Sequence, residues 1–238
     1  MTRRLIVNAD DFGASHGVNA GIVTAHDRGI VRSASLMVRG RAAGEAVELA
    51  RVRPGLSLGL HVDLGEWVHV AGQGWRERYV VVDTADAAAI ADEVERQVSM
   101  FVELTERAPT HVDGHQHIQR HEPAGAVLRA VASRLGVSLR TADDQITYRG
   151  EFYGQGPRAE PHHEGITVGG LVAIIASLPD GWTELGCHPG IAVDPIESAY
   201  AVEREMELAV LCSPELRDAI DRNKVVLSSF LDLLSARC

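Results

Sequence analysis

Two adjacent carboxylates, Asp10 and Asp11, end a short apolar run that begins at Leu5 and is followed by Gly13. Such a run is typical of a buried strand. Neighbouring acids at a strand end repel each other and lose hydration, so a cation or a proton must offset them. Because successive side chains of a strand point to opposite faces, we expect the two carboxylates to have different roles. A solvated turn, or Asp11 as the N-cap of the next helix, is the alternative.

Histidines end three later apolar runs, at His61, His115 and His188. A divalent metal held by one carboxylate and two imidazoles, with positions left open, is a recurrent hydrolytic and oxygenase site. Asp11, His61 and His115 supply that donor set. Each histidine also has a structural alternative, because a lone histidine near a buried strand is more often a hydrogen-bonded core residue.

The segment from His111 to His117 concentrates polar groups that can bind metal. His111, Asp113, His115 and His117 share one parity, so in an extended chain they would face the same way. They are too many for one set of ligands. Asp113 is a reasonable orienter of an imidazole, and His111 or His117 is a core residue or a substrate contact.

The elements that must position these residues alternate between strands and helices along the whole chain. Predicted strands cover residues 5–11, 33–38, 56–64, 110–118, 138–142, 183–190 and 225–229, and predicted helices cover residues 15–29, 42–53, 87–107, 122–136, 171–178, 198–211 and 214–223. This alternation is typical of a parallel α/β fold. The polar residues end different strands, and those ends meet on one face of a barrel. We therefore predict a TIM-like (β/α) barrel with a single domain over residues 1–238.

Two irregular segments are predicted as loops. Residues 65–79 break the pattern and carry Trp67 and Trp75, whose rings could stack on sugars or pack on the core. Residues 148–170 are rich in glycine and proline, and a loop of this length in a compact domain is usually functional or mobile. Phe152 and Tyr153 in this segment are candidate substrate contacts.

Composition excludes several classes of partner. The chain has 33 acidic and 23 basic residues, a net charge of −10, and no extended basic cluster. Nucleic acid and anionic membranes are therefore unfavourable partners. Its 3 cysteines lack CxxC spacing, which favours a reducing compartment over a disulfide framework. With no apolar leader or membrane-length run, we expect a soluble, cytoplasmic protein.

The motifs together resemble those of the YdjC-like carbohydrate deacetylases, which include the chitooligosaccharide and the hopanoid-associated deacetylases. The resemblance runs nearly the whole chain. It is carried by Asn8-Ala9-Asp10-Asp11-Phe12-Gly13, Gly59-Leu60-His61, Thr110-His111-Val112-Asp113-Gly114-His115-Gln116-His117 and Cys187-His188-Pro189-Gly190. It implies a distorted (β/α) barrel, a homodimer, one divalent metal that is usually magnesium, and hydrolysis of N-acetyl groups on sugars.

The resemblance also implies roles for single residues. The family's metal ligands fall on Asp11, His61 and His115, and its catalytic base falls on Asp10. Asp10 would then take a proton from a metal-activated water, and His188 would protonate the departing amine. A structural histidine ahead of a proline is the alternative for His188.

Two points stay open at this level. Two imidazole ligands suit zinc, iron or nickel better than magnesium, but we follow the resemblance and expect Mg²⁺, with Zn²⁺ or another transition metal as the alternative. The segment Arg204-Glu205-Met206-Glu207-Leu208 matches a late family segment, but the sequence assigns it no role.

Two other functions compete with deacetylation. One is a different metal-dependent barrel hydrolase that acts on a phosphoester or a cyclic amide. For phosphate such an enzyme would need arginines near the site, and Arg39, Arg120 and Arg140 are the plausible ones. The other is a sugar-binding protein without catalysis, which would be expected to have lost the base at Asp10.

Overall fold

The central element of the computed structural model is β1 (Arg3–Phe12), the strand that carries the two adjacent carboxylates. The structure describes residues 2–193 and 198–237. β1 lies within an eight-stranded sheet in the order β7-β6-β3-β2-β1-β9-β8, and β10 pairs with the first half of β1. All ladders of this sheet are parallel. Its other strands are β2 (Ser33–Leu36), β3 (Ser57–Val62), β6 (His111–Gly114), β7 (Ser138–Leu139), β8 (Ile146–Arg149), β9 (Gly181–Cys187) and β10 (Val226–Ser228).

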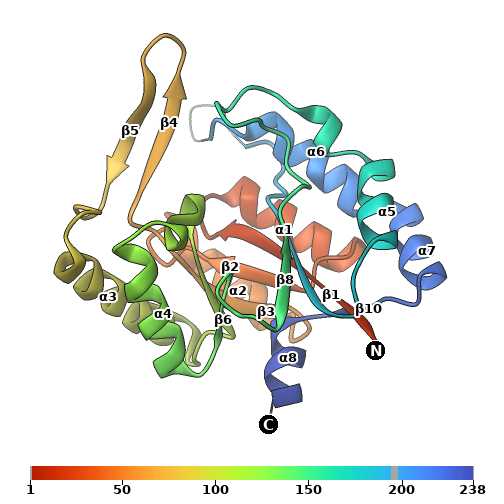
Figure 1. Cartoon of the computed structure of the whole chain (residues 1–238), viewed down its shortest axis with the longest axis horizontal. Coiled ribbons are helices and arrows are strands. Elements are labelled where there is room, and N and C mark those ends of the chain that lie inside the picture. Colours follow the sequence, from red (N-terminus) through yellow and green to blue (C-terminus); the bar gives the residue numbers. More distant parts are fainter. Residues whose placement is uncertain (1, 194–197, 238) are drawn as a thin grey trace.

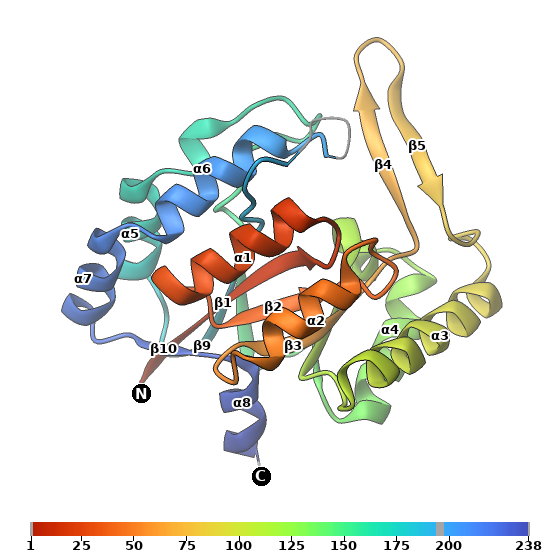
Figure 2. The same ribbon diagram turned by 180° about the vertical axis from the view of Figure 1, so that it is seen from behind.

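The sheet curls into a half-barrel with helices packed around it (Figures 1 and 2). Among the described residues, no ladder joins the edge strands β7 and β8. The prediction of a distorted TIM-like barrel is therefore confirmed. None of the described helices is long and apolar enough to cross a membrane. The α-helices are α1 (His16–Arg28), α2 (Ala43–Arg51), α3 (Ala87–Thr105), α4 (Ala124–Leu135), α5 (Val168–Ala176), α6 (Ala201–Leu211), α7 (Pro214–Arg222) and α8 (Phe230–Arg237).

The long helix α3 shows how the sequence sets these elements. The Asp86 side chain caps it by accepting hydrogen bonds from the backbone N–H groups of Ala88 and Ala89. Apolar side chains at helical spacing then form its buried stripe, Ile90, Val94, Val98 and Phe101. Polar Glu93 and Gln97 lie on the same buried side, and both reach residues near the functional site.

The prediction of a loop at residues 65–79 is wrong. These residues form an antiparallel hairpin of β4 (Gly65–Val70) and β5 (Gly74–Val80), which stands out from the barrel (Figure 1). Its turn uses Gly72 and Gly74, whose φ angles of 75° and 74° suit residues without a Cβ. Glycine-rich composition alone does not distinguish a loop from the turn of a hairpin, and here the glycines form the turn.

Three further elements were missed or misplaced. The sequence does not predict β8, whose last two residues fall in the segment predicted as a loop, and α8 follows the strand predicted to close the chain. The rest of the glycine-rich segment is irregular, with one antiparallel bridge between Gln155 and Pro161 and the short 3-10 helix η2 (His163–Gly165). The short strands have few residues in which a period-two pattern can be recognised.

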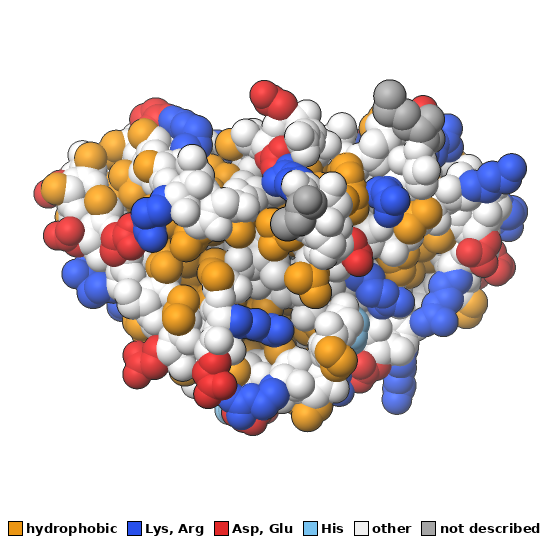
Figure 3. Space-filling model, turned by 90° about the horizontal axis from the view of Figure 1, so that it is seen from below, with side chains coloured by type: hydrophobic (Ala, Val, Ile, Leu, Met, Phe, Trp, Pro, Cys, Tyr) orange, Lys and Arg blue, Asp and Glu red, His pale blue; other side chains and the backbone are white. Residues whose placement is uncertain are grey.

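Helix α8 closes the barrel at the end opposite the carboxylates. Its first residue, Phe230, stacks on the ring of His111 with centroids 3.8 Å apart. His111 is fully buried and bonds Ser35 and Thr110, so it is a structural residue of the barrel interior. Seen from below (Figure 3), charged side chains rim this face and hydrophobic side chains gather inside the rim.

The fit of His111 against its neighbours predicts the effect of one methyl group. A Cβ on Gly59 would lie 2.3 Å from the His111 ring. Phe230 blocks the ring from the other side, so we expect Gly59→Ala to lower the free energy of unfolding by about 1–3 kcal/mol. Urea denaturation measures this. Gly44→Ala is the control, because a Cβ there meets nothing within 4 Å. It should not lower the free energy of unfolding. Equal stability of the two variants would contradict the packing described.

Candidate metal centre and catalytic site

The two adjacent carboxylates of β1 are both buried at the carboxyl end of the sheet, where each has a different set of partners. Asp10 and Asp11 are each 3% exposed. The pairing of β1 with β2 shifts register between Ala9 and Phe12, and Asp11 has a φ of 66°. This irregularity breaks the strict alternation of a strand. Different roles were expected for the two residues, and their different partners agree with that expectation.

Asp11 is grouped with His61 and His115 in an arrangement that could hold a metal ion. His61 Nε2 and His115 Nδ1 lie 3.3 Å and 3.1 Å from Asp11 Oδ1. One donor atom from each of the three residues lies within 4.8 Å of the others. His115 Nε2 is buried and has no hydrogen-bond partner among the described residues. Three strand ends thus deliver the three predicted ligands to one place.

Asp113 orients the first imidazole. His61 and Asp113 are register neighbours on β3 and β6, and His61 Nδ1 lies 2.7 Å from Asp113 Oδ1. The bond leaves Nε2 directed at Asp11, as in carboxylate–histidine–metal arrangements. This placement agrees with the orienting role predicted for Asp113.

The electrostatics of the triad fit a cation. Burial disfavours a charged His61, but Asp113 and Asp11 outweigh it and raise the pKa of His61 well above its ordinary value. Burial also opposes a charged Asp11, yet Arg204 and His115 hold its pKa well below the usual range. Carboxylates that charge a buried imidazole would equally stabilise a metal ion. The donor set of two imidazoles and one carboxylate is typical of transition metals with open positions.

Asp10 is held by Arg140, a fully buried guanidinium. Arg140 Nη1 and Nη2 donate to Asp10 at 2.5 Å and 2.7 Å. Arg140 also pairs with Asp113 at 2.9 Å and with Glu184 at 2.7 Å. Burial raises the pKa of Asp10, but Arg140 outweighs it and the net shift is downward. Arg140 therefore belongs to the interior of the barrel and does not offer a phosphate site on the surface.

His188 lies beside Asp10 in a setting of aromatic rings and one buried acid. Its Nε2 is 3.7 Å from Asp10 Oδ2, and Tyr153 and Tyr200 approach it edge-on with centroids 5.5 Å and 5.6 Å away. The backbone N–H of His188 donates to Glu207 Oε2, and its Nδ1 lies 3.9 Å from Glu207 Oε1. Burial lowers the pKa of His188 to about 4, so its imidazole is neutral in the resting site.

Sequence reasoning missed the roles of Arg204 and Glu207. Arg204 Nη2 donates to Asp11 Oδ2. Glu207 accepts from Tyr200 Oη at 2.6 Å, and burial raises the pKa of Glu207 to about 8. The sequence signal for them was that Arg204 and Glu207 both lie on the buried side of the helix predicted over 198–211. The segment 204–208 that contains them had no role assigned from the resemblance.

The structure places the remaining candidate residues differently. The strand of His111 ends at Gly114, and Gln116 and His117 have φ angles of 50° and 56° in the 3-10 helix η1 (His115–Arg120). The expected shared parity therefore fails after residue 114. His117 Nε2 faces Tyr148 Oη at 3.4 Å. Phe152 is 1% exposed and lies in the core, so only Tyr153 of the predicted aromatic pair reaches the site.

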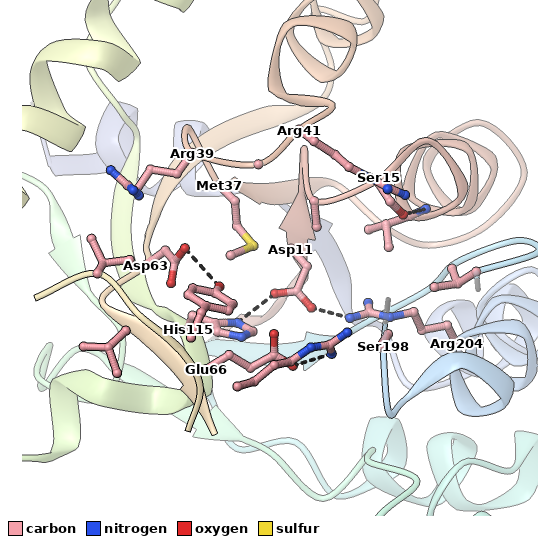
Figure 4. Close-up of a pocket in the computed structure, with 18 residues that line it drawn as sticks. Asp11, Ser15, Met37, Arg39, Arg41, Asp63, Glu66, His115, Ser198 and Arg204 are labelled. Carbon is pink, nitrogen blue, oxygen red and sulfur yellow. Dashed lines mark hydrogen bonds and ion pairs between the residues drawn. The ribbon is translucent and has the colours of Figure 1, made fainter. Parts of the chain in front are cut away.

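A cavity of about 490 Å³ opens onto Asp11 and His115. Asp63 lies on one side of it, and Ser198 and Arg204 lie on the other (Figure 4). Tyr79, which is bonded to Asp63, also lines the cavity. Its volume falls within the ~300–1,000 Å³ range of small-molecule sites. Substrate therefore has a route to the Asp11, His61 and His115 triad.

Comparison with known proteins shows similarity over nearly the whole chain. The model of the family described as YdjC-like protein matches residues 4–222. Chitooligosaccharide deacetylases of Salmonella schwarzengrund and of Enterobacter sp. (strain 638) are 33% and 34% identical, and each match covers 98% of this chain and 100% of the relative.

Solved structures share the fold at lower identity. A protein of Enterococcus faecalis V583, described as a candidate cellobiose-phosphate cleavage protein, superposes with a TM-score of 0.80 at 24% identity, covering 98% of this chain and 99% of that one. A family 4 carbohydrate esterase from Streptomyces lividans gives 0.56 at 13% identity, covering 95% and 91%. At these identities the likeness concerns the fold alone.

The triad predicts measurable metal binding. We expect metal-free protein to bind one equivalent of a divalent metal, with Mg²⁺ and Zn²⁺ titrated separately, and to be stabilised by about 2.7 kcal/mol at a metal concentration of 100 times Kd. His115→Ala should weaken binding at least tenfold because it removes a donor. Calorimetric titration and thermal melts measure both effects. His121→Ala, an exposed histidine just beyond η1, is the control; equal affinity in the two variants would refute the triad.

Proposed function

This chain belongs to the YdjC-like protein family, and we propose that it is a metal-dependent deacetylase that removes N-acetyl groups from an amino sugar or a short chitooligosaccharide. The single observation that carries the proposal is the placement of Asp10 and His188, 3.7 Å apart, next to the Asp11, His61 and His115 triad. A base, an acid and a metal site within one buried cluster are what amide hydrolysis needs. The names of the full-length relatives supply the substrate class.

The residues divide the chemistry between them. A divalent metal held by Asp11, His61 and His115 would polarise the acetyl carbonyl and lower the pKa of a bound water. Asp10, fixed by Arg140, accepts the proton of the attacking water as general base. His188 starts neutral, receives a proton at Nε2 from Asp10, and donates it to the departing amine. The acetamide C–N bond then breaks to give acetate and the free amino sugar.

Glu207 positions the acid in this mechanism without touching the substrate. Through its two oxygens it fixes the backbone N–H of His188 and the hydroxyl of Tyr200, which also accepts from Gly154 N. Tyr200 in turn stacks on Tyr153 with centroids 4.7 Å apart. The orientation of the His188 ring therefore depends on Glu207.

The identity of the metal and the wider setting of the protein remain proposals. The family resemblance favours magnesium, whereas two imidazoles favour zinc, iron or nickel, so activity with a series of metals decides. A homodimer and a cytoplasmic location follow from the resemblance and the composition alone. The phosphoester hydrolase has less support, because Arg140 is fully buried, Arg120 lies over the Tyr148 ring at 5.4 Å, and Arg39, which lines the cavity, pairs with Glu93 at 3.2 Å.

Acetate release tests the function and the base together. We expect metal-restored protein to release acetate from N,N′-diacetylchitobiose, and chelation to stop it. Asp10→Asn should lower kcat by about 10²–10⁴-fold, the usual contribution of a general base, while metal affinity is retained. The measurement is acetate against time for both proteins at several metal identities.

Asp27→Asn is the matched control and should leave kcat unchanged, because this exposed carboxylate forms its ion pair with Arg53 on the surface. A wild-type protein that binds metal, folds, and releases no acetate from any N-acetyl sugar would contradict the proposed function. If the Asp10→Asn protein kept full activity, the proposed deacetylation would stand, but Asp10 would not be its general base.

The positioning role of Glu207 predicts a specific kinetic change. Glu207→Gln disturbs the orientation of His188 but not the cavity, so kcat should fall about 10–100-fold, as for a misplaced catalytic group, with KM changed less than about threefold. Glu203→Gln is the control, one turn earlier on α6 and bonded only to His163 among the described residues. If Glu207→Gln lowered the melting temperature and the fraction of active protein but left kcat per active site unchanged, the role of Glu207 would be merely structural.

A further inference from the structure

The cavity beside the metal triad has a polar wall that the proposed chemistry does not use. Tyr79 Oη donates to Asp63 Oδ2 at 3.0 Å, and both residues line the cavity that contains Asp11 and His115. Figure 4 shows Asp63 and Asp11 turned toward the same space, with Met37 between them and His115 beneath. The burial of Tyr79 and the Asp63 carboxylate raise the pKa of Tyr79, and Asp11 contributes as well. The wall is therefore within electrostatic range of the metal triad.

This wall is rigidly built from two elements. Asp63 is 4% exposed, its N–H donates to Gln97 Oε1, and its carbonyl accepts from Gln97 Nε2. Its Oδ1 accepts from Gly65 N at the start of β4. Tyr79 comes from the partner strand β5. A carboxylate that is fixed through its own backbone and through two neighbours is preorganised to accept further hydrogen bonds.

The chemistry of the wall selects the ligand. Because the Tyr79 hydroxyl donates its proton to Asp63, its remaining lone pairs can only accept, and the Asp63 carboxylate accepts as well. The nearby Arg39 points away from Asp11 to Glu93, to which it donates at 3.2 Å (Figure 4). Hydrogen-bond acceptors beside the apolar Met37 side chain match a pyranose ring, which presents hydroxyl donors at its edge and C–H groups on its face.

We propose that Asp63 and Tyr79 form a sugar subsite that binds the hydroxyl groups of a pyranose ring of the substrate, while its acetamido group faces the metal triad. The inference rests on the proposed function for the identity of the ligand. It adds the residues that select a sugar over other acetylated molecules. A site built to bond hydroxyl groups discriminates strongly against analogues that lack them.

Tyr79→Phe is the principal test, because it removes one oxygen and keeps the ring. We expect kcat/KM for N,N′-diacetylchitobiose to fall about 3–10-fold through KM, the loss of one hydrogen bond. Asp63→Asn should cost about 10–100-fold, as a charged acceptor is lost. For Tyr79→Phe, the fall in kcat/KM on 4-nitrophenyl acetate, which has no sugar hydroxyls, should be at least threefold smaller than the fall on the sugar. Glu77→Gln, an exposed residue of β5 outside the cavity lining, is the control and should change neither activity.

A binding measurement separates this inference from the reaction itself. In the Asp10→Asn background, calorimetric titration with N,N′-diacetylchitobiose should give a Kd about 3–10-fold weaker with Tyr79→Phe than without it. Equal losses on the sugar and the ester, or an unchanged Kd, would overturn the subsite. A wild-type protein that binds the sugar through Tyr79 but releases no acetate would instead overturn the proposed function and leave the subsite standing.

Discussion

The buried guanidinium of Arg140 is the interaction on which the rest of the site depends. It lies inside the half-barrel and pairs with carboxylates from three strands, Asp10 on β1, Asp113 on β6 and Glu184 on β9. Removing one partner of such a buried ion pair typically costs about 3–5 kcal/mol, because the other charge is left uncompensated. Arg140 follows the edge strand β7, and its partners extend across the sheet to β9. Ion pairs thus connect strands of the half-barrel that no backbone ladder joins directly.

The charges around Arg140 explain why this cluster suits a cation. Carboxyl groups outnumber guanidinium groups in it: Asp10, Asp11, Asp113, Glu184 and Glu207 against Arg140 and Arg204. Without a metal, protons make up the difference. Burial raises the pKa of Glu184 to about 7, and the carboxylates around His61 raise its pKa. A divalent ion at Asp11, His61 and His115 would take over the charge that these protons now supply.

Features of the site were predictable from the sequence where a local pattern encodes them, and not where they depend on contacts between residues far apart in the chain. Asp11, His61 and His115 were predictable because each ends a strand, and parallel strand ends meet on one face. The shared parity of residues 111–117 failed because left-handed residues after Gly114 end the strand, and no local pattern gives that away. Arg204 and Glu207 were beyond reach because nothing in the sequence pairs them with Asp11 and His188 from the far end of the chain. The hairpin at 65–80 was not predicted, because glycines in a short segment are equally typical of a loop and of a hairpin turn.

The hairpin of β4 and β5 and the segment after β6, both predicted incorrectly from the sequence, are joined to each other by hydrogen bonds. The Gln116 side chain, held out by a left-handed backbone next to His115, accepts from Trp67 N at 2.9 Å and donates to Trp67 O at 2.8 Å. A side-chain amide that bonds both backbone groups of one residue replaces the missing neighbour of an edge strand. The hairpin is therefore bonded to the segment that carries His115, a candidate metal ligand. These two hydrogen bonds tie the strand pair that carries Tyr79 to the segment that carries His115. If Tyr79 holds a sugar ring as proposed, the same contacts would help to place that ring relative to His115.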